Sequence, residues 1–206
     1  MAHRQPSLVL ASGSPRRRRL LERAGIGFTV RAADIPEERA PGEPPEEFAL
    51  RLAREKALAT SHALADPDAA HRAVLAADTI VVIDDLVLGK PRNAEHAVGM
   101  LGQLVGRSHV VTTAVAVVAG AQLAVRSLAV HSRVHMRAAG EAEIRAYVAT
   151  GEPLDKAGAY ALQGEGRRFV EAVEGSESNV IGLPIEETLE LLHAVGVDAD
   201  RARDTS

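Results

Sequence analysis

The sequence predicts an α/β fold, a single domain in which helices flank a mixed, twisted β-sheet. Short apolar, β-branched segments alternate along the chain with segments whose apolar residues recur at helical spacing. No internal repeat, low-complexity stretch or linker-like gap interrupts this alternation. The length, 206 residues, is also close to that of one ordinary domain. We therefore expect one domain over residues 1–198 and a polar tail over residues 199–206.

The first expected elements surround an unusual loop. A strand over residues 8–11 leads into Ser12-Gly13-Ser14-Pro15 and then into an arginine-rich helix that ends near Gly25. Ser14 is the expected N-cap, and Pro15 fits the first helical turn, where a missing N–H costs nothing. Residues 31–45 are rich in proline and acid and predict a loop.

The second helix is expected over residues 45–65. Phe48, Leu52, Ala59 and Ala63 form its apolar stripe, and Lys56 falls within that stripe.

The remaining elements follow from the same two periodicities. We expect strands over residues 74–83, 86–88, 109–118, 122–137 and 169–173, and helices over residues 93–104, 141–150 and from 184 onward. Asn93 is the predicted cap of the first of these helices. His131 and His135 have a helical metal-ligand spacing, but the alternation around them predicts a strand with both on its polar face, so we expect no metal there.

Composition and charge exclude several classes of function. The formal net charge is −4, so the chain has no global cationic field for nucleic acid or an anionic membrane. Aromatic residues make up 2%, too few for a stacking platform for single-stranded nucleic acid. Cysteine is absent, which removes disulfides and thiolate chemistry.

The same data set expectations for location and partners. No apolar run approaches the ~20 residues of a membrane span, and the first residues lack the core of a signal peptide. We expect a cytoplasmic protein with no membrane and no nucleic-acid partner, and a homodimer stays an open alternative.

The loop Ser12-Gly13-Ser14-Pro15-Arg16-Arg17 is the first candidate site. A loop between a strand and a helix N-terminus presents free backbone N–H groups and the positive end of the helix dipole. Arg16 and Arg17 add bidentate donors for phosphate oxygens. The segment predicts a phosphate-binding loop, and the alternative is a plain capped helix with a solvated basic face.

Charged residues at apolar positions are the second signal. Asp78 lies inside an otherwise apolar strand, where a carboxylate is costly unless it holds a cation or moves a proton. The alternative for Asp78 is a carboxylate that caps a turn. Lys56 points an ammonium along a buried stripe, unless it snorkels at the edge of that stripe. Lys90 could hold a cation beside a phosphate, and Glu37 could supply a hard oxygen ligand for Mg²⁺ or lie in a solvated loop.

Six segments in order resemble the Maf family of nucleoside triphosphate pyrophosphatases. They are LASGSPRR (10–17), RLAREKA (51–57), ADTIVV (77–82), LGKPR (88–92), GEPLDKAGAYALQG (151–164) and IGLPIEET (181–188). The resemblance covers almost the whole chain. It implies an α/β fold of the Maf and inosine triphosphatase kind, with a nucleotide-binding cleft. It also implies hydrolysis of a nucleoside triphosphate to the monophosphate and pyrophosphate with a divalent metal cation, Mg²⁺ or Mn²⁺.

The resemblance also implies roles for individual residues. The catalytic aspartate of the family falls on Asp78, which also serves the metal, and its acidic metal-side residue falls on Glu37. Its helix and hairpin lysines fall on Lys56 and Lys90. The substrate-binding positions are Ser12, Ser14, Arg16, Arg17, Thr79 and Gln163. Of these, Arg16, Thr79 and Gln163 match the branch that prefers dTTP and UTP.

Chemistry gives Gln163 an independent interpretation. A glutamine amide offers one acceptor and two donors, which can meet the N3–H group and a neighbouring carbonyl of uracil or thymine. The alternative is that Gln163 only braces the turn at Gly164-Glu165-Gly166. For the chain as a whole, two rivals remain: a nucleotidyltransferase with a similar phosphate loop, and a non-catalytic nucleotide-binding regulator of cell division.

Overall fold

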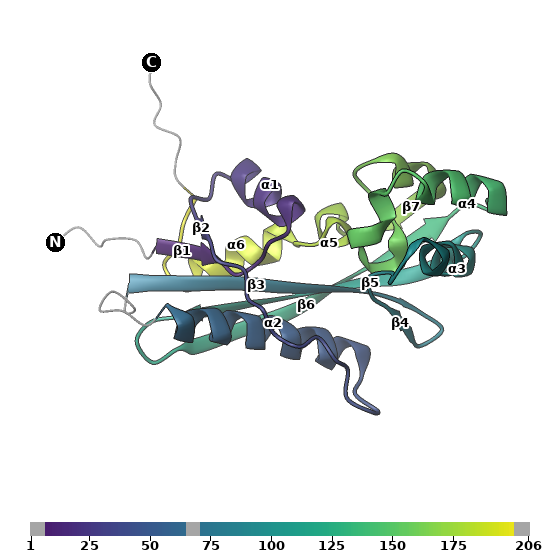
Figure 1. Ribbon diagram of the computed structural model, residues 1–206. Helices are drawn as coiled ribbons and strands as arrows, with labels where there is room; N and C mark the ends of the chain where they lie inside the picture. The colour runs from purple at the N-terminus through teal and green to yellow at the C-terminus, as the bar shows by residue number, and fades with distance from the viewer. Residues whose placement is uncertain (1–6, 65–70, 200–206) are drawn as a thin grey trace, which may run out of the picture. The chain divides into compact units, whose positions relative to one another are not determined.

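The computed structural model describes residues 7–64 and 71–199, so residue 65, the predicted end of the second helix, and most of the predicted tail lie outside it. Seven strands form one mixed sheet flanked by helices (Figure 1), which confirms the predicted α/β class. The strands are β1 (Ser7–Leu10), β2 (Thr29–Val30), β3 (Arg72–Ile83), β4 (Leu86–Leu88), β5 (Ser108–Ala119), β6 (Ala124–Met136) and β7 (Val170–Glu174). Their order is β2-β1-β3-β5-β6-β7, with β4 paired to β3. Strands β2, β1 and β3 are parallel, whereas the β3–β4 and β6–β7 pairs are antiparallel.

Six α-helices and three 3₁₀ segments complete the described chain. The helices are α1 (Pro15–Arg23), α2 (Pro45–Ala63), α3 (Ala94–Leu104), α4 (Glu141–Val148), α5 (Glu177–Ile181) and α6 (Ile185–His193), and the 3₁₀ segments are η2 (Glu152–Asp155), η3 (Ala157–Ala159) and η4 (Glu165–Phe169). The predicted elements agree with these bounds to within two residues where both ends are described. The short elements β2 and α5 were not predicted. Among the described residues, no helix is both long and apolar enough to cross a membrane.

Contacts divide the chain into two compact units. Unit 1 comprises residues 1–78, 114–129 and 182–206, and unit 2 comprises residues 79–113 and 130–181. The chain passes from one unit to the other within β3, between Asp78 and Thr79, and again within β5 and β6.

Unit 1 places helices on both faces of its part of the sheet. Helix α2 covers one face, and helices α1 and α6 cover the other (Figure 1). The register of β1 with β3 pairs Val9 with Val74 and Leu10 with Leu75, and all four side chains are buried.

The buried face of α2 differs from the predicted stripe. Phe48 and Leu52 are buried as expected, but Ala59 is half-buried and Ala63 is exposed. The residues that α2 buries are Phe48, Ala49, Leu52, Ala53, Lys56, Ala57 and Thr60. Around the helix axis, the middle of this buried face points nearer to the direction of Lys56 than to that of Leu52. Ala63 is the last residue of the helix. The predicted inward direction of Lys56 is confirmed.

Unit 2 has its own core. Helices α3 and α4 contact each other, and Met100, Leu104, Tyr147 and Phe169 are among the side chains that the unit buries. The predicted cap of α3 is confirmed, because Oδ1 of Asn93 accepts a hydrogen bond from the backbone N–H of His96 at 2.8 Å.

The two histidines of β6 are also where the alternation placed them. His131 is exposed and His135 is half-buried. Their side chains bond to Thr112, and to Ser108 and Glu174, respectively.

Candidate active site

The loop between β1 and α1 is held by its own serine. The backbone N–H of Ala11 donates to the carbonyl of Leu75 at 2.7 Å, which continues the pairing of β1 with β3. Ser12 is buried, and its hydroxyl oxygen accepts from the backbone N–H of Ser14 at 3.2 Å. Ser14 occupies the predicted N-cap position of α1, but its side chain makes no capping hydrogen bond. The predicted N-cap position of Ser14 is therefore confirmed, although the side chain that accepts a hydrogen bond in this turn is that of Ser12.

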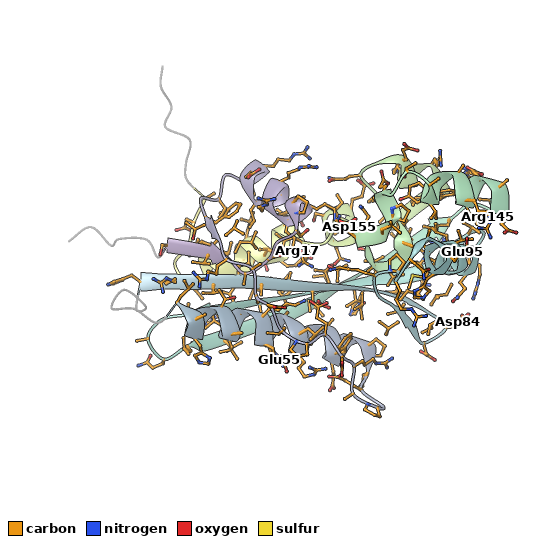
Figure 2. The ribbon with its side chains drawn as sticks, in the orientation of Figure 1. Arg17, Glu55, Asp84, Glu95, Arg145 and Asp155 are labelled. Atoms are coloured by element: carbon orange, nitrogen blue, oxygen red, sulfur yellow. The ribbon has the colours of Figure 1, made fainter. Side chains whose placement is uncertain are left out.

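Arg17 fixes the same loop from the helix side. Its Nη1 donates to the hydroxyl oxygen of Ser12 at 3.0 Å, and its Nε donates to the carbonyl of Gly182 at 2.8 Å. Figure 2 labels Arg17 on α1. Burial lowers the pKa of Arg17 below its usual value, while the charge of Asp78 acts in the opposite direction. Two N–H groups of the Arg17 guanidinium are therefore used in hydrogen bonds within the protein. Arg16, the next residue back, is half-buried at the start of α1.

Residues that follow this loop in the sequence form a buried ion-pair cluster. Its lysine lies on α2, and one of its two acids lies on β3. Nζ of Lys56 lies 2.7 Å from Oδ1 of Asp78 and 2.6 Å from Oε1 of Glu37. Lys56 and Asp78 are 8% and 7% exposed, whereas the side chain of Glu37 is half exposed. Two carboxylates therefore share one ammonium, and the charge of Arg17 also acts on both of them. Such a pair is costly to desolvate, which favours a functional role over a stabilising one.

Glu37 owes its position to a clamp on the loop before α2. Nε of Arg51 donates to Oε1 of Glu43 at 2.7 Å, and its Nη2 donates to the carbonyl of Glu38 at 3.0 Å. The hydrogen bond from Arg51 lowers the pKa of Glu43 to about 2. Sequence reasoning missed this clamp, because the acids of a proline-rich loop resemble a solvated surface.

The residues present suit a hard divalent cation. Glu37 and Asp78 supply hard carboxylate oxygens, and one oxygen of each is paired with the Lys56 ammonium. Mg²⁺ is commonly bound by one or two carboxylates together with substrate phosphates, so it needs no larger protein cage. In the described chain no group of three or more His, Cys, Asp or Glu residues forms such a cage.

The other predicted site residues belong to unit 2. Thr79 is half-buried, and its hydroxyl is 2.9 Å from that of Thr113, which donates to the carbonyl of Asn179 at 2.9 Å. Lys90 is exposed after β4, next to Gly89, whose carbonyl accepts from the backbone N–H of Gly158 at 3.1 Å.

Gln163 is exposed in the loop between η3 and η4. The turn that follows it is braced by another residue. The Glu152 carboxylate accepts from the backbone N–H groups of Glu165 and Gly166, each at 3.0 Å. The bracing role left open for Gln163 is thus filled by Glu152.

Unit 1 thus brings together five predicted site residues: Ser12, Arg17, Glu37, Lys56 and Asp78. Ser14 and Arg16 lie on the same loop and helix start. Thr79, Lys90 and Gln163 lie on three separate segments of unit 2. Sequence reasoning missed two groups: the carbonyl of Gly182, which accepts from Arg17, and the carboxylate of Glu152. Their only signal in the sequence was that they lie in the motif segments 181–188 and 151–164, respectively.

An α/β sheet with a phosphate-type loop beside a buried acid and lysine defines a candidate phosphate-processing enzyme. The chain belongs to the family described as Maf-like protein, whose profile matches residues 7–195. This confirms the family predicted from the six segments.

Curated relatives are similar over nearly their whole length. The dTTP/UTP pyrophosphatase of Anaeromyxobacter dehalogenans (strain 2CP-1) is 52% identical over 193 residues, 93% of this chain and 95% of the relative. The dTTP/UTP pyrophosphatase of Myxococcus xanthus (strain DK1622) is 51% identical over 195 residues, 94% of each protein. The one from Desulfotalea psychrophila (strain LSv54) is 49% identical over 185 residues, 90% of this chain and 92% of the relative.

Proposed function

We propose that this chain hydrolyses nucleoside triphosphates, with dTTP and UTP preferred, to the nucleoside monophosphate and pyrophosphate. The observation that carries the proposal is the buried Lys56 ammonium held between Asp78 and Glu37. The names of relatives that are about half identical to this chain support the same reaction and the same two substrates.

The reaction follows from the charges of the cluster. Water attacks the α-phosphorus and pyrophosphate leaves. Asp78 orients the water, accepts its proton or holds the cation, and Glu37 contributes to cation binding. Lys56 and Arg16 stabilise the charge that develops on the phosphate oxygens, with Ser12, Ser14 and Arg17 shaping the loop that receives them. The role expected of Lys90 stays a prediction. Asp78 and Glu37 would hold a divalent cation, Mg²⁺ or Mn²⁺, which when bound would supply Lewis-acid polarisation of the phosphates.

Substrate preference is assigned to the base. Gln163 reads the N3–H group and a neighbouring carbonyl of uracil or thymine, with Thr79 of the same unit in support. The supporting role expected of Arg16 stays a prediction. Guanine presents two adjacent donors, which an acceptor-only carboxylate would suit better than an amide.

The cellular setting is part of the proposal. We propose that residues 1–198 form a single catalytic domain, because the strands β3, β5 and β6 each run through both compact units. We also propose that the protein acts in the cytoplasm. Nucleotides, and not nucleic acid or membranes, are its partners, in line with a net charge of −4. A homodimer is the oligomer to test.

The test is turnover of a panel of nucleoside triphosphates with Mg²⁺ or Mn²⁺ in ¹⁸O-labelled water. We expect UTP and dTTP to yield pyrophosphate, the label to enter the monophosphate, and chelation to stop the reaction. Release of orthophosphate, or label in pyrophosphate, would contradict attack at the α-phosphorus. A sugar-phosphate acceptor is included in parallel, because turnover only in its presence would favour the nucleotidyltransferase.

A further inference from the structure

The loop that carries Gln163 is anchored by one carboxylate from outside it. The carboxylate of Glu152, in η2, accepts three hydrogen bonds. Its Oε2 accepts from the backbone N–H of Glu165 at 3.0 Å, and its Oε1 accepts from that of Gly166 at 3.0 Å and from the hydroxyl of Tyr147 at 2.8 Å. Two consecutive backbone donors just after Gln163 therefore end on the same side chain.

Tyr147 anchors the loop on the other side of Gln163. Tyr147 is fully buried in α4, and its hydroxyl oxygen accepts from the backbone N–H of Ala161 at 3.2 Å while it donates to Glu152. The main chain is thus fixed two residues before Gln163 and two and three residues after it. One hydrogen-bonded pair of side chains connects both anchor points.

The backbone of the loop lies directly against this pair. A Cβ atom on Gly166 would lie 2.5 Å from the Tyr147 hydroxyl oxygen, and one on Gly164, whose φ is +153°, would overlap the Glu152 carboxylate. Glycine is required at both positions for the main chain to come this close. The two glycines therefore let the main chain approach the Glu152 carboxylate and the Tyr147 hydroxyl directly.

Charge also suits these roles. Burial acts to raise the pKa of Glu152, but the hydrogen bonds from Gly166, Tyr147 and Glu165 overcome it and lower the pKa below its usual value. Burial, and then the hydrogen bond to Glu152, raise the pKa of Tyr147. Glu152 thus stays an acceptor and Tyr147 stays a donor near neutral pH.

We propose that Glu152 and Tyr147 are positioning residues that set base selectivity by fixing the main chain on both sides of Gln163. This rests on the proposed function, in which Gln163 reads the base. Neither side chain needs to touch the nucleotide. The role is to hold the Gln163 amide where its acceptor and donor face the pyrimidine edge, since misplacement by about 1 Å is enough to lose such a contact.

The experiment compares Glu152→Gln, Tyr147→Phe and Gln163→Ala, and the double variant Glu152→Gln with Gln163→Ala. The substrates are UTP, dTTP and GTP, with KM and kcat measured from pyrophosphate release. For Glu152→Gln we expect KM for UTP and dTTP to rise about tenfold, as for one lost hydrogen bond at the base. We expect little change in kcat, a smaller effect on GTP, and a weaker change of the same kind for Tyr147→Phe.

The double variant separates positioning from general structural damage. If Glu152 acts through Gln163, the double variant should be no less selective than Gln163→Ala alone. Amide hydrogen exchange should also speed up at residues 161, 165 and 166 in Glu152→Gln. Glu95→Gln is the matched control, because it neutralises another hydrogen-bonded carboxylate of unit 2, paired with Arg145 (Figure 2), and should change neither selectivity nor exchange in the loop.

The outcomes distinguish this inference from the proposed function. Equal loss on all three nucleotides, or a loss that adds fully to that of Gln163→Ala, would overturn the positioning role alone. If Glu152→Gln fails to fold, Tyr147→Phe decides between the same outcomes, because it keeps the carboxylate. A wild-type chain that releases no pyrophosphate from UTP or dTTP would overturn the proposed function and this inference with it.

Discussion

The cluster around Lys56 and the loop around Gln163 both use buried or half-buried charge, but they satisfy it differently. In unit 1, the Lys56 ammonium meets the side-chain charges of Asp78 and Glu37. In unit 2, the Glu152 carboxylate meets two backbone N–H groups and a tyrosine hydroxyl. Side-chain ion pairs can be exchanged for the charges of an incoming cation and phosphates. Hydrogen bonds to the backbone instead fix the shape of a loop.

This difference predicts two kinds of variant. Changes in the Lys56 cluster should affect every nucleotide alike, because all of them carry the same triphosphate. Changes around Gln163 should alter the ranking of nucleotides, because only the base differs between them. Four experiments test this division.

Replacement of Asp78 by Asn should have the largest effect. The amide keeps the shape and can still accept from Lys56, but it loses the charge needed to bind a cation or take a proton. We expect kcat to fall by at least ~10², the low end for loss of a general base, and by the same factor for UTP, dTTP and GTP.

Asp84→Asn is the control, because Asp84 is an exposed turn carboxylate bonded to Arg107 (Figure 2) and its positive φ suits asparagine. Near-normal turnover in a folded Asp78→Asn protein would move the chemistry away from this cluster.

The candidate roles of Lys56 and Asp78 were predictable from the sequence, because a charged side chain at a position that the apolar pattern buries is costly unless it is paired or functional. Asn93 was predictable because a helix cap is a local interaction. Glu152 was not, since an acid in a glycine-rich loop resembles a solvated one until the fold brings residues 165 and 166 to it. Ser14 shows a limit of local reasoning, because the contact of its backbone N–H with the Ser12 hydroxyl spans only two residues and was not predicted. The interactions of Glu152 were missed because tertiary packing sets them.

Replacement of Lys56 by Met should cost stability as well as activity. Methionine fills the space of the lysine stem but leaves the buried Asp78 carboxylate without its ammonium. Breaking a buried pair in this way typically costs about 3 to 5 kcal/mol of unfolding free energy. We expect a value near the low end by denaturant titration, because the positive charge of Arg17 also acts on Asp78.

A double variant, Lys56→Met with Asp78→Asn, provides the internal check. It should recover most of the lost stability but none of the activity, because the unpaired charge is gone. If Lys56→Met unfolds no earlier than wild type, the ion pair contributes nothing to the fold.

Replacement of Gln163 by Glu should change selectivity. A carboxylate accepts but does not donate, so a carbonyl of uracil or thymine would lose its donor. We expect UTP and dTTP to lose roughly 1 to 3 kcal/mol of binding, the cost of a polar group left without its partner, and GTP to lose much less. Steady-state kinetics on the three nucleotides measure this. An equal loss of kcat/KM on all of them would show that Gln163 does not read the base.

The smallest effect concerns a buried histidine of unit 2 that serves neither site. His109 is 2% exposed, its Nε2 is 2.8 Å from the hydroxyl of Tyr160, and its Nδ1 is buried with no hydrogen-bond partner among the described residues. Burial lowers its pKa to about 4, against an ordinary value of 6.5. His109 is therefore neutral in the folded protein near neutral pH.

The lowered pKa gives the sign of a pH effect on stability. Between pH 6.5 and pH 4 the unfolded chain binds a proton that the buried ring does not, so His109 makes the folded state progressively less stable as the pH falls through this range. At about pH 5.5 the loss is about 1 kcal/mol relative to neutral pH. His109→Gln can still bond to Tyr160 but does not titrate, so the difference in unfolding free energy between wild type and this variant should shift by that amount in favour of the variant. His62→Gln, which changes an exposed histidine of α2, should show no such shift. A difference between wild type and His109→Gln that does not change with pH would show that the ring takes up its proton as easily in the folded protein as in the unfolded chain. Selectivity for UTP and dTTP should be the same in both proteins, because the glutamine of His109→Gln can keep the hydrogen bond to Tyr160.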